Sequence, residues 1–130
     1  IFSKKVRDLL VNKKDVTKKD LALLKSGRHF RHSGAKVILG RNEADNSMLK
    51  KMLQDGDIFI EPVGFPGPAA IVSEGDSPEL MEYAGSLIVK YALEKAGSLR
   101  TLRAVRADVA VEFEVAGPAS DELIDGTRVC

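Results

Sequence analysis

The sequence predicts a single α/β (α+β) domain, in which helices pack on a mixed or mostly antiparallel sheet after two short N-terminal helices. Three observations predict this class. Short runs rich in β-branched residues occur at 36–39, 57–63 and 69–73. Apolar residues recur at helical spacing over 78–96, and apolar and charged residues alternate over 100–116. Because extended and helical patterns alternate along the chain, we expect one sheet covered by helices.

The composition is that of one globular domain. The chain has 130 residues, of which 44% are hydrophobic and 30% are charged. No apolar run is long enough to cross a bilayer, so no membrane partner is expected. The single cysteine, Cys130, can form no internal disulfide, and no Cys/His cluster has metal-ligand spacing. We therefore expect no metal and a cytoplasmic setting. Because the chain opens on Ile1, we expect a piece of a longer protein.

Positive charge is concentrated at the N-terminus. Residues 1–36 hold eleven Lys or Arg against three Asp, a net charge of +8, whereas the remaining residues carry −7. Such asymmetry is typical of a polyanion partner, because phosphate contacts are made by Lys and Arg. A solvated face of a surface helix would give the same counts, so both interpretations stay open.

Residues 2–10 and 18–25 predict two short amphipathic helices, the second capped by Thr17. Gly27 is expected to end the second helix. Each helix has apolar residues that we expect to face the core: Val6, Leu9 and Leu10 in the first, and Leu21 and Leu24 in the second.

Residues 28–32 are expected to be extended and to turn at Ser33-Gly34 into a strand over 36–39. Asn42 is expected to cap the next helix, with Asp45 in its first turn. That helix ends at Asp55-Gly56 and has an apolar stripe of Met48, Leu49, Met52 and Leu53.

Residues 57–63 predict a strand, in which Pro62 argues for a sheet edge or a bend. Two prolines and two glycines make 64–68 a turn, so this strand is expected to pair with residues 69–73 across it. Ser77 is a cap before a helix over 78–96 that stops at Gly97. The remaining elements are a half-buried strand over 100–116, or two strands with a tight turn near Ala107-Asp108, and a helical turn over 120–124.

The sequence offers no catalytic set. His29 and His32 lie in a basic segment without an adjacent acid, and Cys130 is terminal. Glu61 is the most interesting carboxylate, but an outward-facing strand residue explains it better. We therefore predict no catalytic residue.

Gly40-Arg41-Asn42 lies between a strand and a helix start, where backbone N–H groups and Arg41 could hold a phosphate. A simple turn with Arg41 in a local salt bridge would explain the same residues. No glycine-lysine motif of the Walker type accompanies it, so nucleotide hydrolysis is not supported.

Phe65, in the loop over 64–68, has two interpretations. It plugs the core, which we favour for the residue taken alone, or it is an exposed ring on which an unpaired base could stack, with Gly67 in the same loop.

Together these motifs resemble the RNA-binding (R) domain of the NFACT superfamily. The resemblance runs from about Val37 to Ala96. It rests on Gly40-Arg41-Asn42, Asn46, Gly56-Asp57-Ile58-Phe59-Ile60, the run from Phe65 to Val72, and a helix rich in small residues. In the family, the strand and loop commonly carry histidines. Glu61 and Ala69 stand at the matching positions here, with Pro68 in place of a serine, so no role of those histidines is carried over.

The Glu61-Pro62 strand and the loop over 65–68 resemble the branch of the family fused to PP-loop ATPases related to tRNA thiouridine synthases. Residues 2–9, 17–21 and 27–31 are similar to the connecting region of that branch. The resemblance implies that residues 1–36 are a basic connector and residues 37–130 the R-like domain. It also implies that ATP, adenylation and sulfur transfer belong to a catalytic domain outside this sequence.

We therefore predict an accessory, non-catalytic tRNA-binding domain without a cofactor of its own. The expected phosphate contacts are Arg28, Arg31, Lys36 and Arg41, with Asn42 and Asn46 as hydrogen-bonding groups at the helix start. The alternative is a protein-interaction or dimerisation module that docks on the catalytic domain. The oligomeric state, and which tRNA or uridine is bound, stay open.

Overall fold

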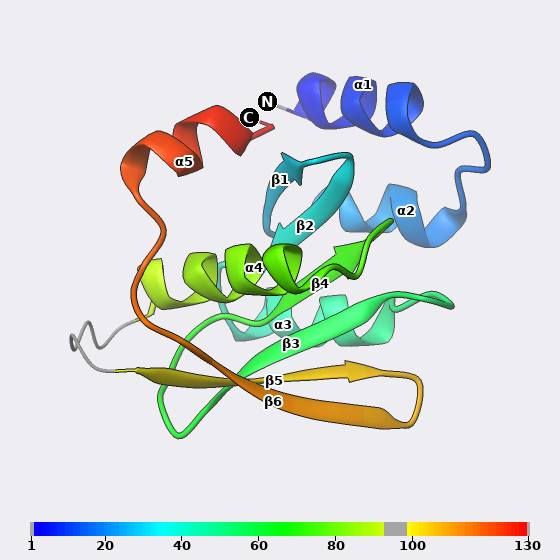
Figure 1. The fold of residues 1–130 in the computed structure, drawn as a ribbon. Helices are drawn as coiled ribbons and strands as arrows, with labels where there is room; N and C mark the ends of the chain where they lie inside the picture. The colour runs from blue at the N-terminus through cyan, green and yellow to red at the C-terminus, as the bar shows by residue number, and fades with distance from the viewer. Residues whose placement is uncertain (1, 93–98, 130) are drawn as a thin grey trace.

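The computed structural model describes residues 2–92 and 99–129. Figure 1 shows three layers: a sheet with helices on both faces. The strands are all antiparallel to their neighbours, in the order β1-β2-β4-β3-β5-β6. The helices are α1 (Phe2–Asn12), α2 (Lys18–Leu23), α3 (Glu43–Lys51), α4 (Pro78–Lys90) and α5 (Asp121–Thr127). The strands are β1 (Arg28–His32), β2 (Ala35–Leu39), β3 (Ile58–Val63), β4 (Ala70–Ser73), β5 (Arg100–Arg106) and β6 (Val109–Val115). The predicted fold class is confirmed.

The sheet buries a separate apolar cluster on each face, because side chains alternate along a strand. The larger cluster joins α4 and α5 to the strands through residues such as Leu87, Ile124 and Val72. The smaller one joins α2 and α3 to the opposite face through Leu23, Leu49 and Ile71. The turn between β2 and α3 and the loop before β4 are therefore held between two packed layers.

Most predicted starts of helices and strands are confirmed, whereas α3 ends at Lys51, with Met52 as its C-cap, and not at Asp55-Gly56 as predicted. Thr17, Asn42, Ser77 and Ser120 all cap helices through their side chains. The alternating tail forms two strands, with Ala107 in a left-handed turn (φ 53°) between them. The long helix ends at Lys90, with Tyr91 as its C-cap, so the prediction that it continues through Ala92 to 96 is wrong at Tyr91 and Ala92; Gly97 lies outside the described residues.

Pro62 is not at an outer edge of the sheet, since β3 lies between β4 and β5. The pairing of β3 with β4 ends at Ile60, however, and beyond it β3 pairs only with β5, where Pro62 lies opposite Leu102. Pro62 therefore lies where β3 has one free side, which needs no N–H donor.

The predicted buried faces of the first two helices are partly wrong. Leu10 is 62% exposed and Leu21 is 51% exposed, whereas Lys5 and Leu23 are buried beside Leu9 and Leu24. Lys5 Nζ donates hydrogen bonds to the Leu24 and Gly27 carbonyl oxygens at 3.2 and 3.1 Å. A lysine is buried because carbonyls at the end of α2 accept from its ammonium group, a pairing that apolar periodicity does not show.

The start of α3 is tied to the loop before β4 by one side chain. Asn46 Oδ1 accepts a hydrogen bond from the N–H of the buried Ala69 at 3.1 Å, and Gly40 N–H donates to the Ala69 carbonyl at 2.9 Å. A Cβ on Gly40 would collide with Asn46 Oδ1. We call Gly40, Asn46 and Ala69 the junction; it fixes the end of β2 against α3 and the loop.

His29 lies in the sheet with 1% of its surface exposed. Its Nε2 is 2.9 Å from the Leu23 carbonyl oxygen, so the neutral ring donates there. Burial, followed by the positive charges of Lys36 and Lys5, lowers the pKa of His29 from 6.5 to about 3. His29 is therefore a neutral core residue that holds the end of α2.

We predict that this histidine makes the fold sensitive to acid. The folded-state pKa lies below the unfolded value, so the neutral ring gives its full stabilisation above pH 6.5 and loses it as the pH falls toward 3. In that window, the unfolded chain binds about one more proton than the folded protein. The unfolding free energy therefore falls by about 1.4 kcal/mol for each pH unit of acidification. Urea unfolding from pH 7 to 4.5 should give a steeper loss for the wild type than for His29→Gln. Equal slopes would contradict this.

We also predict that Asn46→Ala lowers the unfolding free energy by about 1–3 kcal/mol, because the buried Ala69 N–H loses its acceptor. Asn46→Asp retains an oxygen there and is the matched control, with a smaller loss. Gly40→Ala should destabilise the wild type but cost much less in the Asn46→Ala background, because the colliding atom is gone. Denaturant unfolding of this double-mutant cycle measures the coupling; strict additivity would refute the junction.

Candidate nucleic-acid interface

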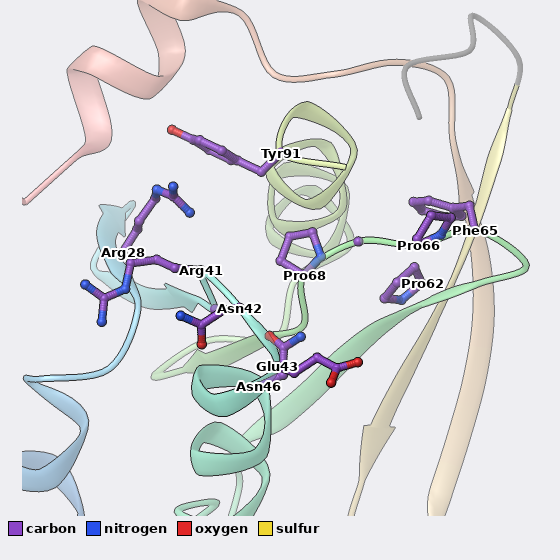
Figure 2. A pocket seen from close by; sticks show the side chains of 12 residues that line it. Arg28, Arg41, Asn42, Glu43, Asn46, Pro62, Phe65, Pro66, Pro68 and Tyr91 are labelled. Atoms are coloured by element: carbon purple, nitrogen blue, oxygen red, sulfur yellow. The ribbon is translucent and has the colours of Figure 1, made fainter. Parts of the chain in front are cut away.

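An open pocket of about 420 Å³ lies above the junction. One wall comes from the turn before α3 and the first turn of that helix; the other comes from the loop over 64–68, the end of β3 and the end of α4 (Figure 2). Its lining residues are Arg28, Gly40, Arg41, Asn42, Glu43, Asn46, Pro62, Phe65, Pro66, Gly67, Pro68 and Tyr91. Six of the eight residues predicted from the sequence therefore meet at one place.

Arg28 begins β1 and is held over the ring of Tyr91, with its Cζ 4.4 Å from the ring centroid. It forms no ion pair with any described residue, so its charge is not neutralised by a neighbour. The guanidinium plane is thus both fixed in position and available at the pocket.

Arg41 is already paired. Asp45 Oδ2 accepts from Arg41 Nε at 2.7 Å and from the Arg41 backbone N–H at 2.9 Å, while Arg41 Nη2 donates to the Lys25 carbonyl at 3.1 Å. The hydrogen bond from Asp45 raises the pKa of Arg41. Burial alone would raise the pKa of Asp45, but the side-chain and backbone hydrogen bonds from Arg41 lower it. The local salt bridge, one of the two interpretations of this turn, is the one the structure contains.

The two asparagines use their carbonyl oxygens inside the protein. Asn42 Oδ1 accepts from the Asp45 N–H at 2.8 Å, and Asn46 Oδ1 accepts from Ala69. Each side chain lines the pocket, where its amide NH₂ has no partner among the described residues. Glu43 lines the same wall, and its carboxylate likewise has no hydrogen bond within the described part of the chain.

Phe65 is 9% exposed and belongs to the core cluster of α4. The Arg100 guanidinium carbon lies 4.9 Å from its ring centroid. The structure thus has Phe65 as a plug, which leaves little of its ring for a base; Gly67 lies beside it, where an added Cβ would contact Ala92.

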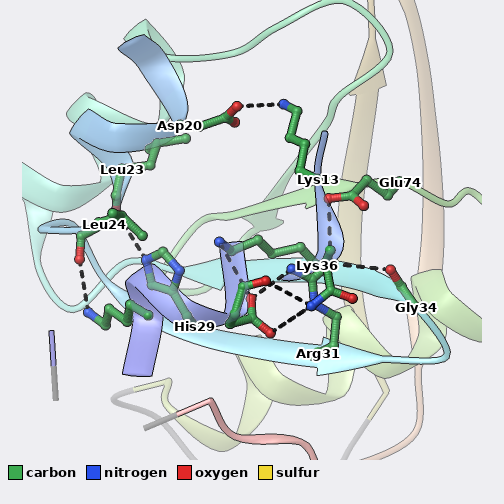
Figure 3. A network of polar contacts seen from close by, with 12 residues as sticks. Lys13, Asp20, Leu23, Leu24, His29, Arg31, Gly34, Lys36 and Glu74 are labelled. Carbon is green, nitrogen blue, oxygen red and sulfur yellow. Dashed lines mark hydrogen bonds and ion pairs between the residues drawn. The ribbon is translucent and has the colours of Figure 1, made fainter. Parts of the chain in front are cut away.

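Arg31 and Lys36 lie at the far end of the β1–β2 hairpin, opposite each other and away from the pocket. Arg31 Nη2 lies 2.7 Å from Asp8 Oδ2 and Nη1 lies 3.4 Å from Glu74 Oε1 (Figure 3). Lys36 is 6% exposed, and burial lowers its pKa. These two cations hold α1 against the sheet, and they do not line the pocket.

Neither residue at the altered family positions lines the pocket. Ala69 is buried at the junction, and Glu61 lies on β3 opposite Arg103 of β5, outside the pocket lining. His32 stacks on Tyr83 with a centroid distance of 4.2 Å. Within residues 2–92 and 99–129, no group of three or more His, Cys, Asp or Glu could hold a metal. In the same residues no helix is long and apolar enough to cross a bilayer.

Sequence reasoning missed Tyr91, Glu43 and the prolines as pocket residues. Tyr91 falls at an apolar position of the predicted long helix, and Glu43 lies in the first turn of α3, where acidic residues are common. Their meeting with Arg28 depends on strand order, for which no local pattern gives a signal.

Comparison with known proteins agrees with this fold. The C-terminal part of the fibronectin/fibrinogen-binding protein from Streptococcus suis superposes with a TM-score of 0.68 at 13% identity. The match covers 98% of this chain and 60% of that one, so the chain spans little more than half of that structure. At this identity the likeness concerns the fold alone. No curated protein matches. The family model of the NFACT protein RNA binding domain matches residues 27–125, from the start of β1 into α5. The chain therefore belongs to the NFACT RNA-binding domain family.

Proposed function

We propose that this chain is a non-catalytic RNA-binding domain that holds the RNA backbone on exposed lysines of the α2–α3 layer. Family membership supports RNA as the partner. The observation that carries the proposal is the position of Lys18, Lys25, Lys50 and Lys51, which are all exposed on the α2–α3 layer. We call these four residues the lysine surface.

The lysine surface leads to the pocket. The two helices run antiparallel, because Lys19 Nζ donates to the Leu53 carbonyl at one end and Arg41 donates to the Lys25 carbonyl at the other. Lys25 therefore lies next to Arg41, which lines the pocket, while Lys18, Lys50 and Lys51 lie toward the opposite end. Lysine ammonium groups are good partners for phosphates. An RNA strand that follows these lysines would therefore reach the pocket.

The finer proposal is that the RNA is tRNA and that the domain serves a PP-loop tRNA-modifying enzyme. The resemblance of residues 2–9, 17–21 and 27–31 to the connecting region of that branch supports it. In that enzyme, ATP and sulfur chemistry would belong to the catalytic domain, in the cytoplasm, and this domain would present the uridine.

A second candidate is a protein-interaction module. An apolar groove of about 750 Å³ between α4 and the β5–β6 hairpin favours it, because Val109 and Val111 are 61% and 57% exposed there. Under this alternative, the groove would take up part of the neighbouring catalytic domain.

We predict that binding of bulk tRNA weakens steeply with salt and depends on the lysine surface. Filter binding at several salt concentrations should give a slope of log affinity against log salt that is lower by about two in Lys25→Ala/Lys51→Ala, since each lost phosphate contact removes about one. The matched control is Lys90→Ala/Arg106→Ala, which removes two cations paired with Asp121 and Asp76. Equal slopes for both double variants, or salt-insensitive binding, would contradict the proposal and favour the apolar groove.

A further inference from the structure

We propose that the pocket receives one unpaired nucleobase of the RNA, stacked on the Arg28 guanidinium, rather than a phosphate. The proposal rests on the RNA binding proposed above and assigns the ligand chemistry of the site. It makes the domain a binder of RNA with an accessible single-stranded base, because a base that is paired and stacked inside a duplex cannot reach into the pocket.

The charges of the pocket argue against a phosphate. Arg41 is bonded to Asp45 through its side chain and its backbone, so a phosphate at Arg41 would have to displace that carboxylate. Glu43 lines the same wall and repels an anion. Arg28 remains as the cation without an ion-pair partner, against the unpaired Glu43. A site with balanced charge suits a neutral ligand.

The walls have the chemistry of a base site. Pro62, Pro66 and Pro68 supply apolar surface on one side, and Arg28 supplies a planar group held in place by Tyr91 (Figure 2). Unpaired bases in RNA complexes stack on aromatic rings and on arginine planes, and here an arginine plane is backed by the Tyr91 ring. A volume of about 420 Å³ lies within the range of roughly 300–1,000 Å³ of pockets that hold small organic ligands.

The polar wall favours a particular base edge. The Asn42 and Asn46 oxygens are occupied, so each residue offers its NH₂ as a donor, whereas Glu43 offers only an acceptor. A base that presents a carbonyl oxygen beside a ring N–H satisfies both kinds of group. Uracil and guanine have this edge; adenine has no carbonyl oxygen. We therefore expect uracil or guanine to bind in preference to adenine.

The decisive variant is Arg28→Lys, because lysine keeps the charge but lacks the plane. We expect this variant to bind an oligouridine of about eight nucleotides about tenfold more weakly, with an unchanged salt slope, as befits the loss of one stacked base. A phosphate contact would tolerate the substitution. Fluorescence anisotropy measures the affinity, and thermal unfolding checks that the variant folds. Wild-type affinity in Arg28→Lys would overturn the proposal.

Glu43→Gln supplies the second arm. Glu43 is exposed and has no hydrogen bond among the described residues, so the fold should tolerate the change. We expect the ratio of the affinities for oligouridine and oligoadenosine to fall toward one. The glutamine side chain can donate a hydrogen bond as well as accept one, so it no longer requires a ring N–H on the base. If the pocket held a phosphate, removing the charge would instead strengthen binding of both oligomers equally, and the base proposal would be wrong.

A blunt-ended RNA duplex and Lys25→Ala/Lys51→Ala separate this proposal from the broader one. We expect weaker binding of the duplex than of oligouridine, and loss of affinity in the lysine variant for both. One outcome would contradict the base pocket and leave RNA binding in place. In that outcome the lysine variant loses affinity, Arg28→Lys and Glu43→Gln bind oligouridine as the wild type does, and the wild type binds the duplex as tightly as oligouridine. If the wild type binds no RNA at low salt, both fall.

Discussion

The hydrogen bond from the Ala69 N–H to Asn46 Oδ1 is the constraint on which the pocket depends. Asn46 belongs to α3 and Ala69 ends the loop before β4, so this bond joins the two walls of the pocket. It requires a glycine at position 40, because any Cβ there would occupy the place of the Asn46 oxygen. The glycine and second asparagine of the family motif are thus explained by the fold. Their presence indicates the architecture of the site before it indicates any contact with RNA.

The charge of the N-terminal residues overstates what is available to an RNA. Lys5 donates to two carbonyl groups, while Arg31 pairs with Asp8 and the buried Lys36 lies nearby. These cations bind α1 to the sheet, and removing them from water is compatible with stability only because they have partners. The four residues of the lysine surface stay in solvent, as do Lys4, Arg7, Lys14 and Lys19. A count of charges cannot separate the two groups, because the separation depends on what packs against each side chain.

Local chemistry made the helix starts predictable, and tertiary contacts made the rest unpredictable. Thr17, Asn42 and Ser77 cap helices through bonds to residues three positions away, so the sequence contains the whole interaction. Leu10 and Leu21 were assigned to the core because short helices rich in leucine have more than one apolar side. Which side is buried depends on the hydrogen bonds from Lys5 to the carbonyl groups at the end of α2. The spacing of apolar residues does not reveal that contact.

The pocket combines segments that lie far apart in the sequence. Arg28 comes from the edge strand, Tyr91 from the end of α4 and the prolines from the loop after β3; only the strand order places them together. Six predicted residues meet there, yet their roles differ from the expectation that each arginine binds a phosphate. Arg41 is neutralised by Asp45 and the lysines lie outside, so the arrangement separates two tasks. Under our proposal, charge on the α2–α3 surface attracts the RNA backbone without regard to sequence, and the nearly neutral pocket distinguishes one base from another. A charged pocket would attract any phosphate along the strand and could not select a base.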